Sequence, residues 1–345
     1  MRAQLLPKFG GPDVFVCQDV PTPVPAADQM LVKVAACGVC GHDLLNRAGH
    51  FPHTRLPAVM GHEIAGTIVE VGPLVAGFSP GDRVAVIQRI PCGICGLCRS
   101  GRENICVSGG GFYGEGLSGG YGNFVLASGR NAVSVPAAIP LPVASVLSCA
   151  VGTGFHALRR AQLELGDSVL ITAASGGVGI HTIKLARLLG LRVIAVSTSE
   201  AKSQVLRDAG ADEVLVSPTL SFHKAARDLT GGEGVDAVIE IAGRPTFESS
   251  VRSIKGGGRM VIVGNVEPGQ VGLNPAMAIL KEIDFIGSAH ATVADLKKVI
   301  ELVATNAITP DISKFFDVED AAGAHRLMEE RKSVGRVVLL HGHAG

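Results

Sequence analysis

Four cysteines lie close together in the chain. Cys92, Cys95, Cys98 and Cys106 form the pattern C-x2-C-x2-C-x7-C. Four thiolates at such spacing can surround a tetrahedral ion and leave no coordination position open, as in structural zinc sites. C-x2-C-x2-C also opens the bacterial ferredoxin pattern, but that pattern continues with a fourth Cys after three residues and then a Pro. The pattern therefore favours structural zinc over an iron–sulfur cluster or free thiols. A closed site of this kind indicates a role in stabilising the fold rather than in catalysis.

A second group of possible metal ligands is dispersed along the chain. The segments are CGHD (40–43), GHE (61–63) and SCAVGTG (148–154). Each segment alone is a weak signal, because a lone Cys is often part of a core and a lone His is often a hydrogen-bonded structural residue. These segments become informative only together with the four-cysteine cluster and the glycine-rich turn that follows them.

The glycine-rich turn AASGGVG (173–179) follows a predicted strand and opens a predicted helix. Its pattern is Ala174-x-Gly176-x-x-Gly179, so Ala replaces the first glycine of the dinucleotide-binding fingerprint. Glycines let the backbone approach a pyrophosphate, and a helix N-terminus supplies N–H donors. The predicted cofactor contacts in this turn are Ser175, Gly176, Gly177 and Val178.

The end of the next predicted strand bears on the choice of nicotinamide cofactor. NAD enzymes of this fold place an acidic residue there for the ribose hydroxyls. This chain has Ser197, Thr198 and Ser199, with Lys202 close behind. Hydroxyls and an amine without a carboxylate favour NADP(H), and NAD(H) remains an alternative. The same residues are also suited to capping the helix that follows.

The elements that carry these residues fall into two regions. Before residue 150, short apolar runs such as 31–36, 64–72 and 83–87 are broken by Gly and Pro, which predicts a β-rich, barrel-like unit. After Gly166, strands and helices alternate, which predicts a doubly wound parallel sheet. The predicted strands are 168–174, 192–197, 235–243, 259–264, 284–289 and 334–340, and the predicted helices are 178–189, 200–209 and 292–305.

Length and charge limit the class of protein. The chain has 345 residues, which at about 150 residues per domain suggests two domains. Its 31 basic and 31 acidic residues argue against a nucleic-acid partner, whose binding depends on clustered basic residues. The uncharged stretch 131–158 is interrupted by prolines and glycines, so we expect no membrane span. The N-terminus does not resemble a secretory signal, so we expect a cytoplasmic protein.

Together these motifs resemble the zinc-containing medium-chain alcohol dehydrogenase/reductase family, bacterial type. The resemblance covers essentially the whole chain and includes GFSPGDRV (77–84) and VGRVVL (334–339). It implies a GroES-like β-barrel catalytic domain formed by 1–150 and 287–345, with a structural-zinc lobe at about 91–107. It also implies a Rossmann domain at 151–286 and a homodimer or homotetramer.

The resemblance assigns roles to the dispersed ligands. Cys40, His62 and Cys149 would bind a catalytic zinc, which makes two zinc ions per chain. Glu63 would be the carboxylate that can approach or replace the zinc-bound water, and Asp43 would orient His62. Two thiolates and one imidazole leave a fourth position open, as in catalytic zinc sites.

The resemblance also adds contacts for the cofactor and the substrate. Thr153 and Arg336 would lie near the nicotinamide and the pyrophosphate. The residues lining the nicotinamide would be Ile241, Ala242, Val263, Gly264, Ser288 and Ala289. The substrate pocket would include His42, Phe51, Gln88, Phe112, Asn265 and His290. We expect Cys17 and Cys37 to fill the core, and His50, His53, His156, His181, His325, His341 and His343 to be structural or on the surface.

Position 42 departs from the family pattern. The family usually has Ser or Thr there, whose hydroxyl passes the alcohol proton onward, and in many members a His three residues later completes the relay. This chain has His42 and Leu45 instead. We predict that the His42 imidazole takes the proton directly; the alternative is that it binds the cofactor ribose or fills the pocket.

The predicted function is a zinc-dependent oxidoreductase that interconverts a small-molecule alcohol and an aldehyde or ketone with a nicotinamide cofactor. Zinc would act as a Lewis acid on the substrate oxygen. One alternative is an NADPH-dependent enoyl-thioester or enone reductase, because ASGGVG and STSEAK look like segments of zinc-site-bearing acryloyl-CoA reductases. A remote alternative is a non-catalytic, crystallin-like protein.

Overall fold

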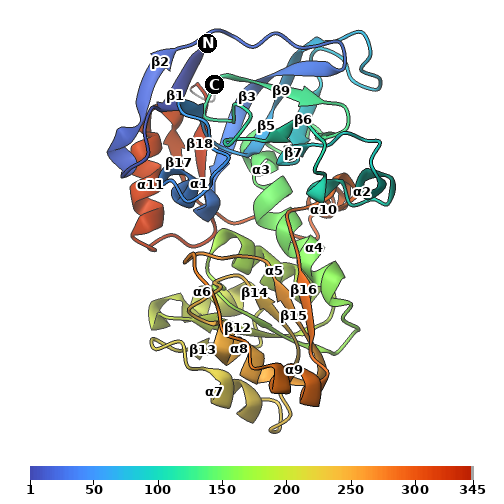
Figure 1. The fold of residues 1–345 in the computed structure, drawn as a ribbon, viewed down its shortest axis with the longest axis vertical. Coiled ribbons are helices and arrows are strands. Elements are labelled where there is room, and N and C mark those ends of the chain that lie inside the picture. The colour runs from blue at the N-terminus through green and yellow to red at the C-terminus, as the bar shows by residue number, and fades with distance from the viewer. Residues whose placement is uncertain (343–345) are drawn as a thin grey trace. The chain divides into compact units, whose positions relative to one another are not determined.

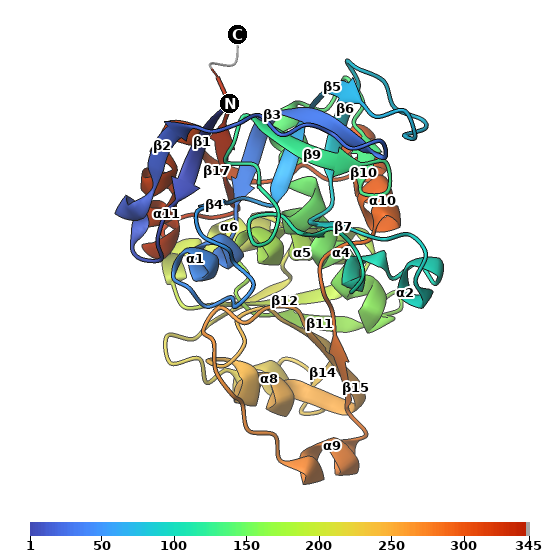
Figure 2. The same ribbon diagram turned by 45° about the horizontal axis from the view of Figure 1, so that its top comes forward.

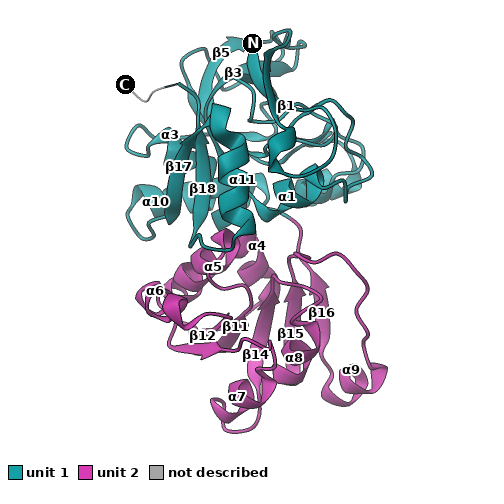
Figure 3. Cartoon of the chain, turned by 90° about the vertical axis from the view of Figure 1, so that its left-hand side faces the viewer, with its two compact units in different colours: residues 1–152, 290–345 teal, residues 153–289 magenta. Residues whose placement is uncertain are grey.

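The computed structural model describes residues 1–342, so His343 lies outside the described part. The chain divides into two compact units (Figure 3). Unit 1 comprises Met1–Gly152 and His290–Gly345, and unit 2 comprises Thr153–Ala289.

Unit 1 is built on an antiparallel sheet that receives its last strands from the C-terminal part of the chain. The strand order is β10-β6-β5-β3-β18-β17, and β9 also pairs with β3. Figure 2 labels β3, β5, β6, β9, β10 and β17 of this sheet. Only the β17–β18 pair in this sheet is parallel. The strands of unit 1 are β1 (Arg2–Leu6), β2 (Val16–Asp19), β3 (Gln29–Val39), β4 (Ala58–Val59), β5 (Glu63–Val71), β6 (Arg83–Val86), β7 (Arg89–Ile90), β8 (Gly111–Phe112), β9 (Phe124–Ser128), β10 (Ala132–Ser134), β17 (Ile312–Asp317) and β18 (Arg336–Leu340).

Most helical segments of unit 1 are short and lie in the connections between its strands, and the longest is α10 (Val293–Ala304) with 12 residues. They are η1 (Pro12–Val14), α1 (Gly41–Arg47), α2 (Gly96–Arg99), η2 (Glu103–Ile105), α3 (Leu141–Ser145), the π-helical turn η3 (Leu147–Val151), α10 (Val293–Ala304), η5 (Val318–Asp320) and α11 (Ala321–Glu329). The core of unit 1 is made by the apolar side chains of the sheet, such as Val32 and Val34 of β3, with Ala321 and Ala324 of α11.

Unit 2 is a six-stranded parallel sheet in the order β13-β12-β11-β14-β15-β16 (Figure 1). Its chain order alternates strand and helix, as in doubly wound folds. The elements are α4 (Gly152–Ala161), β11 (Ser168–Ile171), α5 (Gly177–Leu188), β12 (Arg192–Ser197), η4 (Glu200–Lys202), α6 (Ser203–Asp208), β13 (Glu213–Val216), α7 (His223–Asp228), β14 (Val235–Glu240), α8 (Phe247–Ser253), β15 (Ile254–Ile262), α9 (Pro275–Lys281) and β16 (Asp284–Gly287).

The expected fold class is confirmed by this barrel-like sheet and the parallel sheet. Some local expectations differ from the structure. The helix expected at 200–209 is divided into η4 and α6, and β15 begins at Ile254, five residues before the expected start at 259. Strand β13 was not expected. Its four residues are only half-buried, so they make a weak apolar pattern.

The two lone cysteines have different environments. Cys37 is fully buried in β3, as expected. The expectation that Cys17 fills the core is wrong, because Cys17 is half-buried on β2, whose neighbouring residues are exposed. Its sulfur instead accepts a hydrogen bond from Arg2 Nε at 3.1 Å.

Within residues 1–342, no helix combines the length and the apolar character that crossing a lipid bilayer requires.

Candidate functional site

The four clustered cysteines converge on one point. Their ligand atoms all lie within 4.8 Å of one another. The measured separations between sulfurs are 3.5 Å for Cys95–Cys98, 3.8 Å for Cys92–Cys98 and 4.0 Å for Cys95–Cys106. Sulfurs bound at about 2.3 Å in a tetrahedron around zinc lie about 3.8 Å apart. Unlinked cysteines at these distances fit a closed zinc site.

The environment of Cys92 favours its ligating form, whereas burial raises the pKa of the Cys98 thiol to about 12. Backbone hydrogen bonds from Ile94 and Cys95 lower the pKa of the Cys92 thiol to about 6. The metal ligand is the thiolate. Zinc binding would therefore displace few protons from Cys92 near neutral pH.

A second cluster brings together Cys40, His62, Glu63 and Cys149, whose ligand atoms also lie within 4.8 Å of one another. Three segments far apart in the sequence supply these residues. Cys40 is the N-cap of α1, His62 and Glu63 stand at the start of β5, and Cys149 lies in η3. Two thiols, an imidazole and a carboxylate are the donors that catalytic zinc sites use. The donor set fits zinc.

Asp43 links Cys40 to His62. Its Oδ2 accepts the Cys40 N–H at 2.8 Å, and its Oδ1 lies 3.2 Å from His62 Nδ1. Burial alone would lower the pKa of His62, but the charge of Asp43 and its hydrogen bond raise that pKa well above its usual value. With Nδ1 directed at a carboxylate, Nε2 is the nitrogen free for a metal.

Glu63 is fully buried beside Arg336. Arg336 Nη2 lies 3.0 Å from Glu63 Oε1. Burial raises the pKa of Glu63 to about 7, against the lowering effect of Arg336. Gly38 in the neighbouring strand leaves space for this carboxylate, because a Cβ there would lie 2.2 Å from Glu63 Oε2 and would displace it. The strand therefore makes room for this carboxylate beside the two cysteines.

His42 is held in an aromatic group next to His62. Its ring stacks on Phe51 with centroids 4.3 Å apart and lies 5.1 Å from Phe112. His42 Nε2 lies 3.0 Å from Glu115 Oε1. Its Nδ1 is buried and has no hydrogen-bond partner within residues 1–342. Sequence reasoning missed Glu115, because nothing near position 115 in the sequence indicates that its loop returns to α1.

Two more of the expected pocket residues belong to the same region of unit 1. The His290 ring lies 5.0 Å from Phe112, which in turn lies 5.3 Å from His62. Gln88 is buried and donates from Nε2 to the carbonyl of Ser148, next to Cys149, at 3.0 Å. Asn265 is exposed and belongs to unit 2.

The glycine-rich turn of unit 2 connects β11 to α5. Gly176 is the N-cap of α5, and its N–H donates to the carbonyl of Ala173 at 3.0 Å. A Cβ at Gly179 would lie 2.4 Å from that same carbonyl oxygen, so only glycine allows the helix to start this close to the strand. This is the close packing that the last glycine of the fingerprint provides.

The remaining cofactor candidates cluster along the carboxyl edge of the parallel sheet. Ile241 and Ala242 follow β14, Val263 and Gly264 follow β15, and Ser288 and Ala289 follow β16. These three strands are neighbours in the sheet. Thr153 lies in α4, also in unit 2. Ligands of open α/β sheets bind at this edge.

Ser197 ends β12, and its hydroxyl is already engaged with the backbone. Oγ accepts the Ser199 N–H at 3.1 Å and lies 3.0 Å from the Ser199 carbonyl. Thr198 is exposed. Lys202 Nζ donates to Ser175 Oγ in the glycine-rich turn at 3.3 Å, and burial lowers the pKa of this amine. A cation therefore lies beside the turn, and no acidic residue stands at the end of β12.

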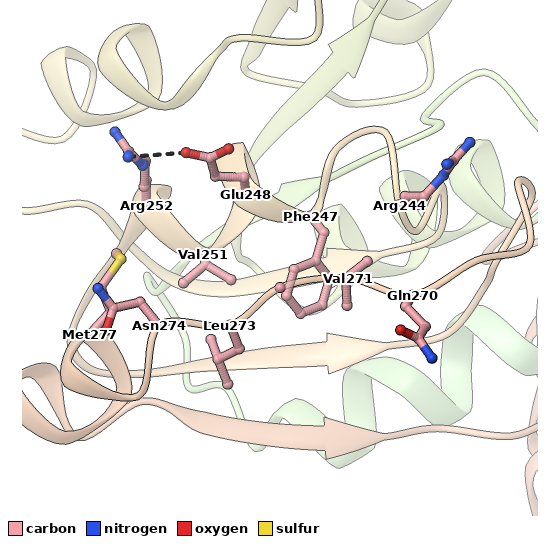
Figure 4. A pocket seen from close by; sticks show the side chains of 11 residues that line it. Arg244, Phe247, Glu248, Val251, Arg252, Gln270, Val271, Leu273, Asn274 and Met277 are labelled. Carbon is pink, nitrogen blue, oxygen red and sulfur yellow. Dashed lines mark ion pairs between the residues drawn. The ribbon is translucent and has the colours of Figure 1, made fainter.

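A separate cavity of about 420 Å³ lies elsewhere in unit 2, along α8 and the segment before α9 (Figure 4). Its lining is apolar at Phe247, Val251 and Leu273, and an ion pair between Glu248 and Arg252 at 3.0 Å borders it. None of the predicted ligand or cofactor residues lines this cavity. We assign it no part in the chemistry.

Comparisons with known proteins agree with this architecture. Residues 26–137 match the alcohol dehydrogenase GroES-like domain, and residues 177–305 match the zinc-binding dehydrogenase domain. An acryloyl-coenzyme A reductase of Metallosphaera sedula is 37% identical over 94% of this chain and 96% of its own. An NAD-dependent alcohol dehydrogenase of Sulfurisphaera tokodaii is 32% identical, and the match covers 99% of this chain and 100% of that protein.

A solved structure extends the match to three dimensions. The crystal structure of AibC superposes with a TM-score of 0.93 at 44% identity, covering 99% of this chain and 96% of that one. Since the sequence matches span both units, the relationship covers the barrel, the four-cysteine lobe and the parallel sheet together. The chain belongs to the zinc-containing medium-chain dehydrogenase/reductase family of oxidoreductases.

Proposed function

We propose that this protein interconverts an alcohol and an aldehyde or ketone by hydride transfer with a nicotinamide cofactor. The observation that carries the proposal is the convergence of Cys40, His62, Glu63 and Cys149 in unit 1. We also propose two zinc ions per chain, one in the cluster of four cysteines and one held by Cys40, His62 and Cys149 with a fourth position left open. We infer a homodimer or homotetramer from the exposed apolar side chains Ile279 and Leu280 of α9. A monomer in sedimentation equilibrium would overturn that assembly.

The chain's own residues hold and orient the reacting groups. When bound, zinc supplies a Lewis acid for the substrate oxygen, and the nicotinamide supplies or accepts the hydride. Cys40, His62 and Cys149 would hold the metal, and Asp43 fixes the ring of His62. Arg336 keeps the Glu63 carboxylate beside the ligands. The glycine-rich turn and the carboxyl edge of the sheet would bind the cofactor.

We assign proton transfer to His42. Glu115 accepts from Nε2, which leaves the buried Nδ1 without a partner in the described part of the chain and able to accept the alcohol proton. His42→Ala is expected to lower kcat for alcohol oxidation about 10²-fold, the usual loss when a general base is removed. His42→Ser should recover part of the rate. The control is His50→Ala, which removes an exposed imidazole. An unchanged kcat in His42→Ala with both zinc ions bound would reject the role.

The cofactor preference is proposed to be NADP(H). Hydrogen bonds to a charged group contribute about 1.5–3 kcal/mol, so one such bond to the ribose 2′-phosphate predicts about 10- to 10²-fold higher kcat/KM with NADPH than with NADH. Lys202, beside the turn, supports this choice. Ser197→Asp should reverse the preference, because a carboxylate repels the phosphate and binds the ribose hydroxyls. Ser221→Asp adds the same charge at an exposed position as a control. If the wild type prefers NADH, Ser197 does not select the cofactor and only stabilises the turn.

A second candidate function is reduction of an enoyl thioester with NADPH. It is supported by the acryloyl-coenzyme A reductase of M. sedula, which is more similar to this chain than the S. tokodaii alcohol dehydrogenase is. Assays of the zinc-loaded protein with a panel of aldehydes, ketones, enones and enoyl-CoAs separate the two functions. If enoyl thioesters are reduced and no alcohol or carbonyl compound is converted, the first proposal fails.

A further inference from the structure

Glu103 connects the four-cysteine lobe to a part of unit 1 that is distant from it in the sequence. It lies in η2, between Cys98 and Cys106, and its carbonyl accepts the N–H of Cys106 at 3.1 Å. Its side chain is directed elsewhere, since Oε1 accepts the N–H of Val293 at 2.8 Å. The two residues are 190 positions apart in the sequence. The lobe and α10 are drawn near one another in Figure 1.

Helix α10 needs the Glu103 carboxylate as an acceptor for its first N–H group. Thr292 is the N-cap of α10, and its capping box with Asp295 satisfies the N–H groups of both of these residues. Val293 is the first residue of the helix, whose N–H has no partner within the helix itself. A carboxylate at this end also interacts favourably with the helix dipole. The lobe therefore supplies an acceptor for the Val293 N–H, which the capping box of α10 does not pair.

The segment just before Val293 adjoins the dispersed ligand cluster. Ala291 packs so closely on Gly152 that a Cβ at Gly152 would lie 2.8 Å from the Ala291 Cβ. Gly152 directly follows η3, which carries Cys149. The His290 backbone is held at φ +55°, which non-glycine residues seldom adopt, and its ring contacts Phe112. Residues 290–293 thus lie between the Cys149 turn and the aromatic group around His42 and His62.

The lobe reaches the same aromatic group by a second contact. Arg89 Nη1 donates to the carbonyl of Cys106 at 2.9 Å. Arg89 pairs with Phe112 across the β7–β8 ladder. Phe112 contacts His42, His62 and His290. The lobe therefore accepts two hydrogen bonds from this region, one from Val293 and one from Arg89.

We propose that Glu103 is a positioning residue. Residues 290–293 form one wall of the substrate site, and Glu103 holds this wall against the four-cysteine lobe. The inference rests on the proposed function, because it takes the Cys40–His62–Cys149 cluster as the reacting centre. A closed metal site does no chemistry itself. The folded lobe around that metal site would nevertheless determine, through Glu103, the position of His290 beside the substrate.

The test compares Glu103→Ala with Glu103→Gln in the zinc-loaded enzyme. The amide oxygen of Gln can still accept the Val293 N–H, whereas Ala cannot. We expect Glu103→Ala to lower kcat/KM at least about tenfold, because a misplacement of about 1 Å far from the reacting atoms can cost about 10²-fold in rate. Hydrogen exchange of the backbone in residues 290–296 should become faster, and Gln should largely restore both properties. Both variants should retain two zinc ions. Glu70→Ala, at an exposed position of β5, is the control.

The outcomes separate this inference from the proposed function. If Glu103→Ala speeds exchange and lowers Tm but leaves kcat/KM unchanged, the contact is only structural and the inference is wrong. If exchange at 290–296 does not respond, the contact does not hold the segment and the inference is wrong whatever the substrate. If the wild type converts no alcohol or carbonyl compound, the proposed function fails. In that case kcat/KM is measured with the enoyl thioester it reduces.

Discussion

Replacing Cys40 with serine is expected to lower kcat at least about 10³-fold while the fold is retained. A Lewis-acid metal contributes several kcal/mol to the transition state, and about 4 kcal/mol corresponds to that factor. Serine is a poor zinc ligand but a preferred N-cap, and Cys40 is the N-cap of α1, so the helix should keep its start. Elemental analysis should give one zinc per chain instead of two.

The matched control for this variant is Cys17→Ser, which replaces a lone half-buried cysteine outside both clusters and should leave activity and zinc content unchanged. His62→Ala is a less suitable variant, because it would leave the buried Asp43 carboxylate without its imidazole partner, which is itself destabilising. Full activity of Cys40→Ser at one zinc per chain would contradict the assignment of this cluster as the reacting centre.

Replacing Cys95 with serine is expected to act on stability. Structural zinc binding in small peptides contributes about 10–16 kcal/mol at neutral pH, and the metal-binding energy is also folding energy. Three remaining thiolates would recover part of it, so we expect a net loss of about 4 kcal/mol or more. For a domain of 150–250 residues each kcal/mol shifts Tm by about 2–4 °C, which gives a fall of about 8–16 °C.

Cys95 is also an N-cap, of α2, so serine should again preserve the local helix and isolate the effect of the metal. Differential scanning calorimetry of zinc-loaded Cys95→Ser and Cys17→Ser measures the difference. An unchanged Tm with one zinc lost per chain would mean that the four-cysteine cluster does not stabilise the fold, and the closed site would need another role.

Features whose residues are close together in the chain are predictable without the structure. Cys92 to Cys106 span so few residues that their thiolates can meet whatever the rest of the chain does. The turn from β11 to α5 was also predictable, because a strand, a glycine pattern and a helical apolar stripe follow one another directly. The dispersed ligands Cys40, His62 and Cys149 were predicted through the resemblance to a family, and their spacing alone left them ambiguous.

The distant side chains that support these groups can be identified only in three dimensions. Glu115 meets His42, Arg336 meets Glu63 and Glu103 meets Val293, each across a long separation in sequence. Apolar periodicity reveals which face of a strand or helix is buried, but a single charged residue carries no periodic signal that identifies its partner. These contacts exist because the sheet of unit 1 brings β18 beside β3 and returns the chain after residue 289 to the lobe.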